Sequence, residues 1–232
     1  MRRARIDAVI DLEFFARGSA VLTYLTGAAR RVGLHRFNGE TAYRGDLMTH
    51  RVAYNSYLHT AQAYDVLVRA LEADPAEVPL LKEAVPDRFP EPTPFRPNEQ
   101  SLAYARELLG PEGGPVIVFH PNCTDTLRIR KWPSERYVEL GRALLDAHPE
   151  AKLVLTGLEG EAAPIAEIAR AIGHEERILN IAGVVPLHEF LCVLMLADVL
   201  VTNDSGPSHF AAMTPIHQVV LYGPKSIGVS GP

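Results

Sequence analysis

Short apolar runs that alternate with helical segments constrain the fold of this chain more than any other feature. Val116 to Phe119 and Val199 to Val201 are apolar on both faces, which is typical of strands buried between helical layers. Ser134 to His148 and Leu187 to Ala197 have helical periodicity. Regular alternation of strands and helices predicts an α/β fold with a parallel sheet covered by helices.

The same reading extends along the whole chain. We expect a helix that begins at Ser134 as its N-cap, after Pro133, and another that begins near Ser205. The expected strands are 6–12, 31–35, 116–120, 152–156, 178–182, 199–203 and 218–222, and the other expected helices are 14–29, 54–72, 98–109, 161–172 and 187–197.

A proline-rich stretch divides the chain. Proline removes a backbone donor and restricts its neighbours, so residues 74–97 are predicted to be a linker between domains 1–73 and 98–232. The first part has too few strands for a complete sheet, and the chain stops directly after a strand and loop. We therefore expect a piece of a longer protein. The prolines of the stretch are Pro75, Pro79, Pro86, Pro90, Pro92, Pro94 and Pro97.

Composition narrows the class of protein. The net charge of −5 argues against a general nucleic-acid binder, which is usually basic. Cys123 and Cys192 lie far apart without metal-ligand spacing, which favours a reducing compartment. The basic N-terminus is followed by acidic residues, not by the apolar region of a signal peptide, and no apolar run is long enough to span a bilayer. We expect a cytoplasmic protein, with which peripheral contact to a membrane is compatible.

Ligands of open α/β sheets bind at the carboxyl ends of the strands, and the loop after residues 199–203 has suitable residues there. Asp204 or Ser205 is expected to cap the next helix, while Gly206 lets a ligand approach the backbone closely. Free N–H groups and the helix dipole would then favour a diphosphate, with His209 one turn further on. The alternative is an ordinary capped helix start with a buried histidine.

The loop after residues 116–120 is a second candidate. It contains Asn122 and Thr124, becomes basic, and ends in Lys131-Trp132-Pro133. Lys131 could neutralise phosphate charge, and threonine hydroxyls could donate hydrogen bonds. The alternative is a solvated loop whose tryptophan anchors the next helix.

A third strand, residues 152–156, leads to Glu161. A carboxylate at this place binds ribose hydroxyls in dinucleotide folds, although a glutamate at a helix start is equally explained by the dipole. Glycine-rich dinucleotide, Walker A, nucleophile-elbow and metal-ligand motifs are absent from the sequence. A hydrolase with Ser205 and His209 is disfavoured, because Asp204 is adjacent to the serine and cannot easily orient the histidine.

At these loops the sequence resembles glycosyltransferase family 9, the lipopolysaccharide heptosyltransferases. The resemblance is carried by Arg130-Lys131-Trp132-Pro133, by Asn203 to Ala212, by Asn180 to Leu187 and by Tyr222-Gly223-Pro224. It implies a GT-B fold, in which the N-terminal, incomplete Rossmann-like domain faces the acceptor and the C-terminal one binds the donor.

The resemblance also implies a function in lipopolysaccharide biosynthesis. It implies an inverting transferase that uses ADP-heptose without a metal or other cofactor, and a lipid-linked or glycan acceptor at the cytoplasmic face of the inner membrane. The alternatives are a different nucleotide-sugar donor, or a nucleotide-binding fragment without activity, because no general base is identified in this chain. The donor-binding residues that the resemblance implies are Lys131, Glu161, Asp204, Ser205, Gly206 and His209. The polar loop after residues 116–120 adds Asn122 and Thr124 to these candidates.

Overall fold

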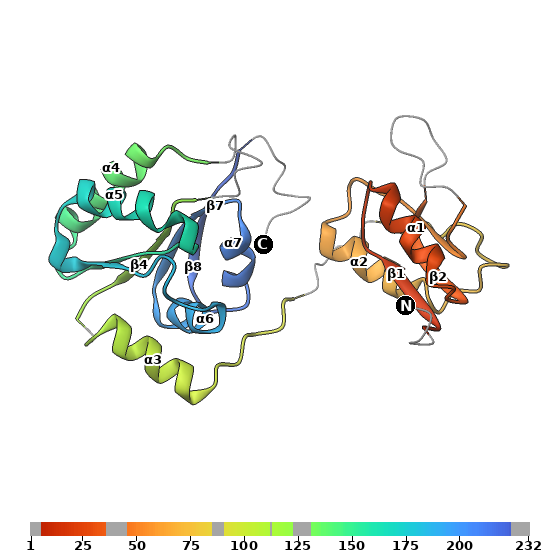
Figure 1. Cartoon of the computed structure of the whole chain (residues 1–232), viewed down its shortest axis with the longest axis horizontal. Coiled ribbons are helices and arrows are strands. Elements are labelled where there is room, and N and C mark those ends of the chain that lie inside the picture. Colours follow the sequence, from red (N-terminus) through yellow and green to blue (C-terminus); the bar gives the residue numbers. More distant parts are fainter. Residues whose placement is uncertain (1–5, 36–45, 85–90, 112, 123–130, 224–232) are drawn as a thin grey trace. The chain divides into compact units, whose positions relative to one another are not determined.

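The computed structural model describes residues 6–35, 46–84, 91–111, 113–122 and 131–223. The described chain divides into two compact units, one up to Glu91 and one from Pro92 onward. Each unit is built around its own parallel sheet (Figure 1). The predicted α/β class with two parallel-sheet parts is therefore confirmed.

The first unit contains a three-stranded sheet in the order β1-β2-β3. Val32 and Leu34 of β2 and Val52 of β3 pack with Val66 and Leu67 of α2 into its core. All three strands are parallel, as expected for strands joined by helical crossovers. Its elements are β1 (Ala8–Asp11), α1 (Arg17–Leu25), β2 (Arg30–His35), β3 (His50–Ala53) and α2 (Thr60–Arg69).

Two helices of this unit are shorter than predicted. Before α1, the Glu13 carboxylate accepts a hydrogen bond from the Phe15 amide, which holds the preceding residues in a turn. Before α2, the His59 side chain accepts from the Ala61 amide while Gln62 bonds back to the His59 amide. This reciprocal cap sets the start of α2 at Thr60.

Part of the proline-rich stretch pairs with the first sheet. Leu81 forms a parallel bridge to Val52. Its amide donates to the Arg51 carbonyl oxygen at 2.9 Å, and its own carbonyl accepts from the Ala53 amide at 2.8 Å. The chain thus returns to the open edge of β3 before it reaches the second unit.

The second unit is a five-stranded parallel sheet in the order β6-β5-β4-β7-β8. From the central β4 the chain builds outward through β5 and β6, then crosses back to β7 and β8. Its elements are α3 (Glu99–Leu109), β4 (Val116–His120), α4 (Ser134–Ala147), β5 (Lys152–Leu155), the 3-10 turn η3 (Glu159–Glu161), α5 (Ala162–Ile172), η4 (Glu175–Arg177), β6 (Ile178–Asn180), α6 (Leu187–Leu196), β7 (Val199–Asn203), α7 (Gly206–Ala211) and β8 (His217–Leu221).

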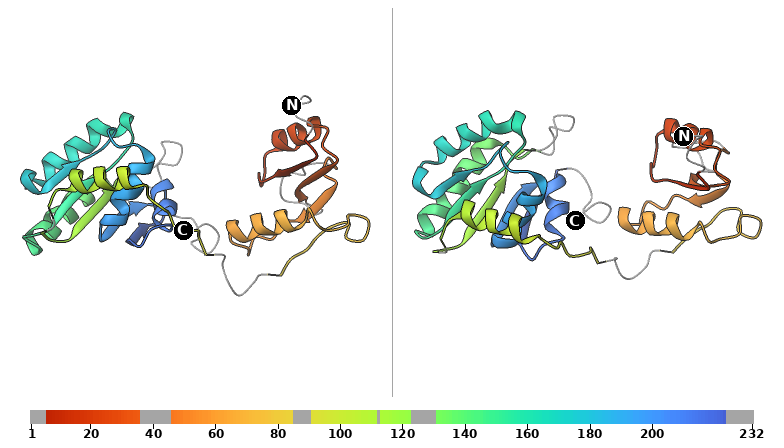
Figure 2. Two further views of the ribbon diagram at one scale, coloured as in Figure 1. Left: turned by 90° about the horizontal axis from the view of Figure 1, so that it is seen from below. Right: turned by 60° about the horizontal axis from the view of Figure 1, so that its bottom comes forward.

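Alternate residues of β4 enter two different cores. Ile117 and Phe119 pack with α4 and α5, whereas Val118 packs with α3 and α6 on the opposite face. Figure 1 shows these two helical layers on either side of the sheet, and Figure 2 shows α3 beside α6. This two-sided burial explains why the strand is apolar at every position before His120.

The predicted cap of α4 is wrong. Pro133 is the N-cap residue and Ser134 is the first helical residue, and no side chain caps the helix. The helix begins directly after Pro133, whose backbone is extended.

No helix within the described residues is long and apolar enough to cross a membrane.

Candidate functional site

A pocket of about 330 Å³ opens at the carboxyl ends of β4, β5 and β7. The central pair β4 and β7 is the topological switch point of the sheet, because the chain leaves these strands in opposite directions. Open α/β sheets bind their ligands at this point. The volume lies within the range of roughly 300–1,000 Å³ usual for small-molecule sites.

The strand register explains which polar side chains meet there. Phe119 of β4 pairs with Leu155 of β5, so the next residues, His120 and Thr156, emerge side by side. His120 Nδ1 lies 3.0 Å from the Thr156 hydroxyl oxygen, and that hydroxyl donates to the Phe119 carbonyl oxygen at 3.2 Å. Both side chains are buried. They form the polar floor of the pocket.

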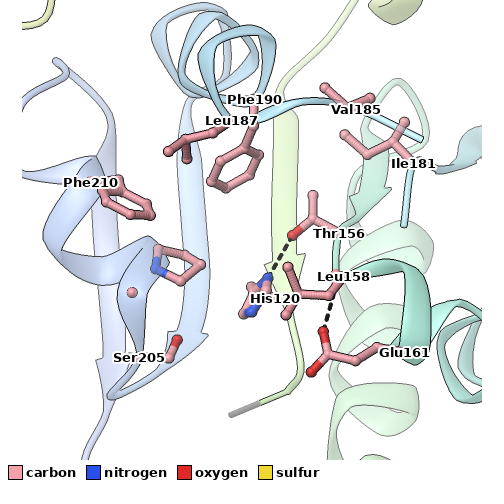
Figure 3. A pocket seen from close by; sticks show the side chains of 13 residues that line it. His120, Thr156, Leu158, Glu161, Ile181, Val185, Leu187, Phe190, Ser205 and Phe210 are labelled. Atoms are coloured by element: carbon pink, nitrogen blue, oxygen red, sulfur yellow. Dashed lines mark hydrogen bonds between the residues drawn. The ribbon is translucent and has the colours of Figure 1, made fainter. Parts of the chain in front are cut away.

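One wall of the pocket is apolar. It comes from the loop after β6, the first turns of α6, and α7, and it lies across from the floor in Figure 3. A wall of this kind suits a flat aromatic ring such as a nucleotide base. Its residues are Ile181, Val185, Leu187, Phe190 and Phe210.

Glu161 occupies the end of the pocket after β5. One carboxylate oxygen, Oε2, accepts a hydrogen bond of 2.8 Å from the Leu158 amide, which folds the side chain back over η3. A Cβ at Gly157 would overlap Ile165 Cδ1 and lie 3.0 Å from Glu161 Oε2. Glycine at 157 therefore permits the close approach that positions this carboxylate.

The start of α7 forms the opposite end of the pocket, but its local bonding differs from the prediction. Ser205 is the N-cap residue, yet its hydroxyl donates to the Asn203 carbonyl oxygen and does not cap the helix. Pro207 has no N–H, and the Ser208 amide already bonds the Ser205 carbonyl oxygen. This six-residue helix thus offers fewer free amides to an anion than we expected.

Asn203 joins the two loops on either side of the switch point. Its Oδ1 accepts from the Trp132 amide at 2.9 Å, and its Nδ2 donates to the Pro121 carbonyl oxygen at 2.9 Å. Asn203 is fully buried. Since Lys131 precedes Trp132, this bond fixes the backbone that carries the exposed Lys131 next to the end of β7.

The structure brings together only some of the predicted donor-binding residues. Glu161, Ser205 and Gly206 line the pocket. Asn122 and Asp204 are buried beside it, while Lys131 and His209 are exposed and lie outside its lining. Thr124 lies outside the described residues. His120, Thr156 and the apolar wall were not predicted as site residues. His120 is the last residue of β4 and Thr156 directly follows β5, and this position at a strand end is a signal by which the sequence could have indicated them.

A metal centre is not apparent among the described residues, where no group of three or more histidine, cysteine or acidic side chains is placed to hold an ion. Metal-independent chemistry remains a prediction of the sequence.

His120 should make stability depend on pH. Burial lowers the pKa of His120 to about 4, whereas an unfolded histidine titrates near 6.5. Between these values the unfolded chain binds more protons, so acidification favours unfolding. From pH 7.5 to pH 4.5 the wild type should lose about 2 kcal/mol more unfolding free energy than His120→Asn. Urea unfolding of both proteins at the two pH values measures the loss. Equal losses in the wild type and in His120→Asn would contradict a lowered pKa of His120 in the folded chain. His50, whose pKa is also lowered mainly by burial, is common to both proteins.

With its switch-point pocket, the second unit has the layout of a Rossmann-like ligand-binding domain. Comparison with known proteins defines the family. The chain belongs to glycosyltransferase family 9 (heptosyltransferase), whose model it matches over residues 1–232. The resemblance inferred from the loop motifs is therefore confirmed, and the chain is a glycosyltransferase-family protein.

The curated relatives that the chain matches are named heptosyltransferases. Lipopolysaccharide heptosyltransferase 2 of Escherichia coli is 32% identical over 131 residues, which cover 56% of this chain and 34% of that protein. Lipooligosaccharide heptosyltransferase 2 of Haemophilus ducreyi is 28% identical over 226 residues, covering 92% of this chain and 60% of the relative. The chain thus spans at most about 60% of the length of these two relatives.

Solved structures confirm the GT-B class of the fold. The E. coli ADP-heptose lps heptosyltransferase II superposes with a TM-score of 0.72 at 23% identity, covering 98% of this chain and 66% of that one. An E. coli heptosyltransferase solved with ADP-2-deoxy-2-fluoro heptose gives a TM-score of 0.59 at 20% identity, covering 96% and 64%.

Proposed function

We propose that the second unit binds a nucleotide-sugar donor, ADP-heptose, in the pocket between β4, β5 and β7. The observation that carries this proposal is one pocket with an apolar wall at one side and Glu161, His120 and Ser205 at the other (Figure 3). A nucleoside diphosphate has the same division into a flat base and a polar ribose-diphosphate. Family membership supports this choice of ligand.

The donor contacts follow from the same division. The base lies against Phe190 and Phe210, and the Glu161 carboxylate accepts from the ribose. The diphosphate extends toward Ser205 and Gly206, where Lys131 supplies a positive charge from the adjoining loop. In this proposal the donor site also includes Asn122 and Asp204, which are buried beside the pocket, and His209, which is exposed outside its lining.

In the proposed reaction, an acceptor hydroxyl oxygen attacks the anomeric carbon of heptose. The bond between that carbon and the diphosphate oxygen breaks, ADP departs with the electron pair, and the acceptor proton passes to a base. Attack opposite the leaving group inverts the anomeric centre. Lys131 stabilises the charge that develops on the diphosphate. The sequence does not identify the base, and no metal is part of the proposal.

The acceptor is proposed to be a lipopolysaccharide-core or related glycan. It would be met at the cytoplasmic face of the inner membrane by residues 1–73, while residues 98–232 hold the donor. The names of the relatives, heptosyltransferases of lipopolysaccharide and lipooligosaccharide, support this assignment.

Calorimetric titration of the whole chain with ADP, UDP and GDP tests the proposal. ADP should bind most tightly, and Lys131→Ala should weaken ADP by about 10- to 100-fold, since a hydrogen bond to a charged group contributes about 1.5–3 kcal/mol. The fluorescence of Trp132, the single tryptophan, offers a second readout beside Lys131.

Arg136→Ala is the matched control. Arg136 is an exposed cation of α4 paired with Glu139, and its loss should leave ADP binding unchanged. A folded chain that binds none of the three nucleotides, or binds them equally and regardless of Lys131, would refute the proposed donor site.

A further inference from the structure

One ring nitrogen of His120 is committed within the protein and the other is turned into the pocket. Nδ1 bonds the Thr156 hydroxyl at 3.0 Å. In Figure 3 the dashed line marks this bond, and the second ring nitrogen, Nε2, points away from Thr156 into the space between Ser205 and Glu161. The pocket thus contains a polar atom that its own protein partners leave available to a ligand.

The Thr156 hydroxyl decides which nitrogen carries the proton. This hydroxyl has a single hydrogen and two neighbours, His120 Nδ1 and the Phe119 carbonyl oxygen. The carbonyl oxygen can only accept, so both bonds form together only when the hydroxyl donates to Phe119 and Nδ1–H donates to the hydroxyl. Nε2 is then unprotonated and is a hydrogen-bond acceptor.

An acceptor at this position selects a ligand group that can donate. The diphosphate of a nucleotide is ionised and offers only acceptors, so it cannot bond an unprotonated Nε2. The base amine is a donor, but the aromatic and aliphatic wall that suits the base lies on the other side of the pocket. The remaining donors of a nucleoside diphosphate are its ribose hydroxyls.

We infer that His120 accepts a hydrogen bond from a ribose hydroxyl of the nucleotide, and that Thr156 is the positioning residue that holds the required tautomer. The inference rests on the proposed nucleotide site. With Glu161 also facing the sugar, the pocket would bind both hydroxyls and discriminate ribonucleotides from deoxyribonucleotides. His120 is thus assigned as a specificity-determining residue.

Two substitutions of His120 separate its two hydrogen bonds. In His120→Asn the amide nitrogen replaces Nδ1 and keeps the bond to Thr156, but no atom reaches the position of Nε2. In His120→Gln the longer side chain returns an acceptor oxygen to that position. Thr156→Val removes the hydroxyl that fixes the tautomer and leaves the imidazole in place.

Calorimetric titration with ADP, 2′-deoxy-ADP and 3′-deoxy-ADP provides the test. Wild type should bind ADP about tenfold more tightly than the deoxy nucleotide that lacks the hydroxyl bonded by His120, as expected for one neutral hydrogen bond. His120→Asn should bind that nucleotide and ADP equally, His120→Gln should recover part of the preference, and Thr156→Val should weaken it. Nitrogen-15 shifts of the His120 ring in the ligand-free chain should show Nδ1–H.

The outcomes separate this inference from the proposed function. If wild type does not bind ADP, both fail. If ADP binds but His120→Asn keeps the full preference for the ribose hydroxyl, or if the ring carries its proton on Nε2, the role of His120 is refuted while the donor site stands.

Discussion

Asn203→Ala should lower the free energy of unfolding of the second unit by about 3 kcal/mol. The substitution removes two hydrogen bonds and leaves the Trp132 amide and the Pro121 carbonyl without their side-chain partner. A polar group left unpaired in a buried site costs about 1–3 kcal/mol. Urea unfolding of the whole chain followed by Trp132 fluorescence measures the loss, because the single tryptophan lies in this unit.

Asn180→Ala is the matched control for this prediction. Asn180 also ends a strand, but it is exposed and its Oδ1 accepts only a local bond from the Ala182 amide. Its substitution should cost less than about 1 kcal/mol. Asn203→Asp keeps the acceptor for the Trp132 amide but places a buried carboxylate oxygen against the Pro121 carbonyl oxygen, so a loss at least as large as that of Asn203→Ala is expected. Equal effects of Asn203→Ala and Asn180→Ala would show that the loop bridge contributes little.

The elements of the second unit could be predicted because burial and periodicity agree there. The bounds of two strands were predicted as observed, those of β4 (Val116–His120) and β7 (Val199–Asn203). Helices cover both faces of these strands, so each strand is apolar up to the polar residues at its end. β3, at His50–Ala53, was missed because two of its four residues are polar or charged. It is recognised as a strand through its pairing with β2 and its bridge to Leu81, both of which are contacts between distant residues.

The site could be predicted only as far as strand ends indicate it. Glu161, Ser205 and Gly206 were predicted in loops after strands, and they do line the pocket. His120 and Thr156 were missed because their contact depends on the register of β4 and β5, which a single sequence does not contain. The apolar wall was missed as well, since residues such as Phe190 are indistinguishable in sequence from core residues of α6.

The hydrogen bond between the loop after β4 and the end of β7 could not be predicted from the sequence either. Trp132 and Asn203 are 71 positions apart, and neither residue type by itself indicates a bridge. In the structure this hydrogen bond joins the Lys-Trp-Pro loop to the Asn-Asp-Ser-Gly loop. The tryptophan amide needs the asparagine, and Lys131 depends on that bond for its place at the switch point.

Gly114 stands where the chain enters the central strand, and we expect Gly114→Ala to destabilise the protein by about 3 kcal/mol. A Cβ at this position would overlap the Glu150 carbonyl oxygen and lie 2.6 Å from the Glu150 carbonyl carbon. Relief requires a backbone shift, yet Val116 of β4 is already paired with Lys152 of β5. Overpacking against an immovable neighbour costs about 1–3 kcal/mol, and backbone neighbours belong at the upper end.

The adjacent glycine offers the control that makes this prediction specific. A Cβ at Gly113 would meet no atom within 4 Å, so Gly113→Ala should change stability by less than about 1 kcal/mol, and in the stabilising direction if the backbone accepts it. Thermal unfolding should show a fall of roughly 10 °C for Gly114→Ala and almost none for Gly113→Ala. Similar unfolding midpoints for the two variants would mean that the backbone before β4 shifts easily to accommodate the Cβ at position 114. The separation between β4 and β5, and with it the His120–Thr156 contact at their far ends, would then not be set by this close approach.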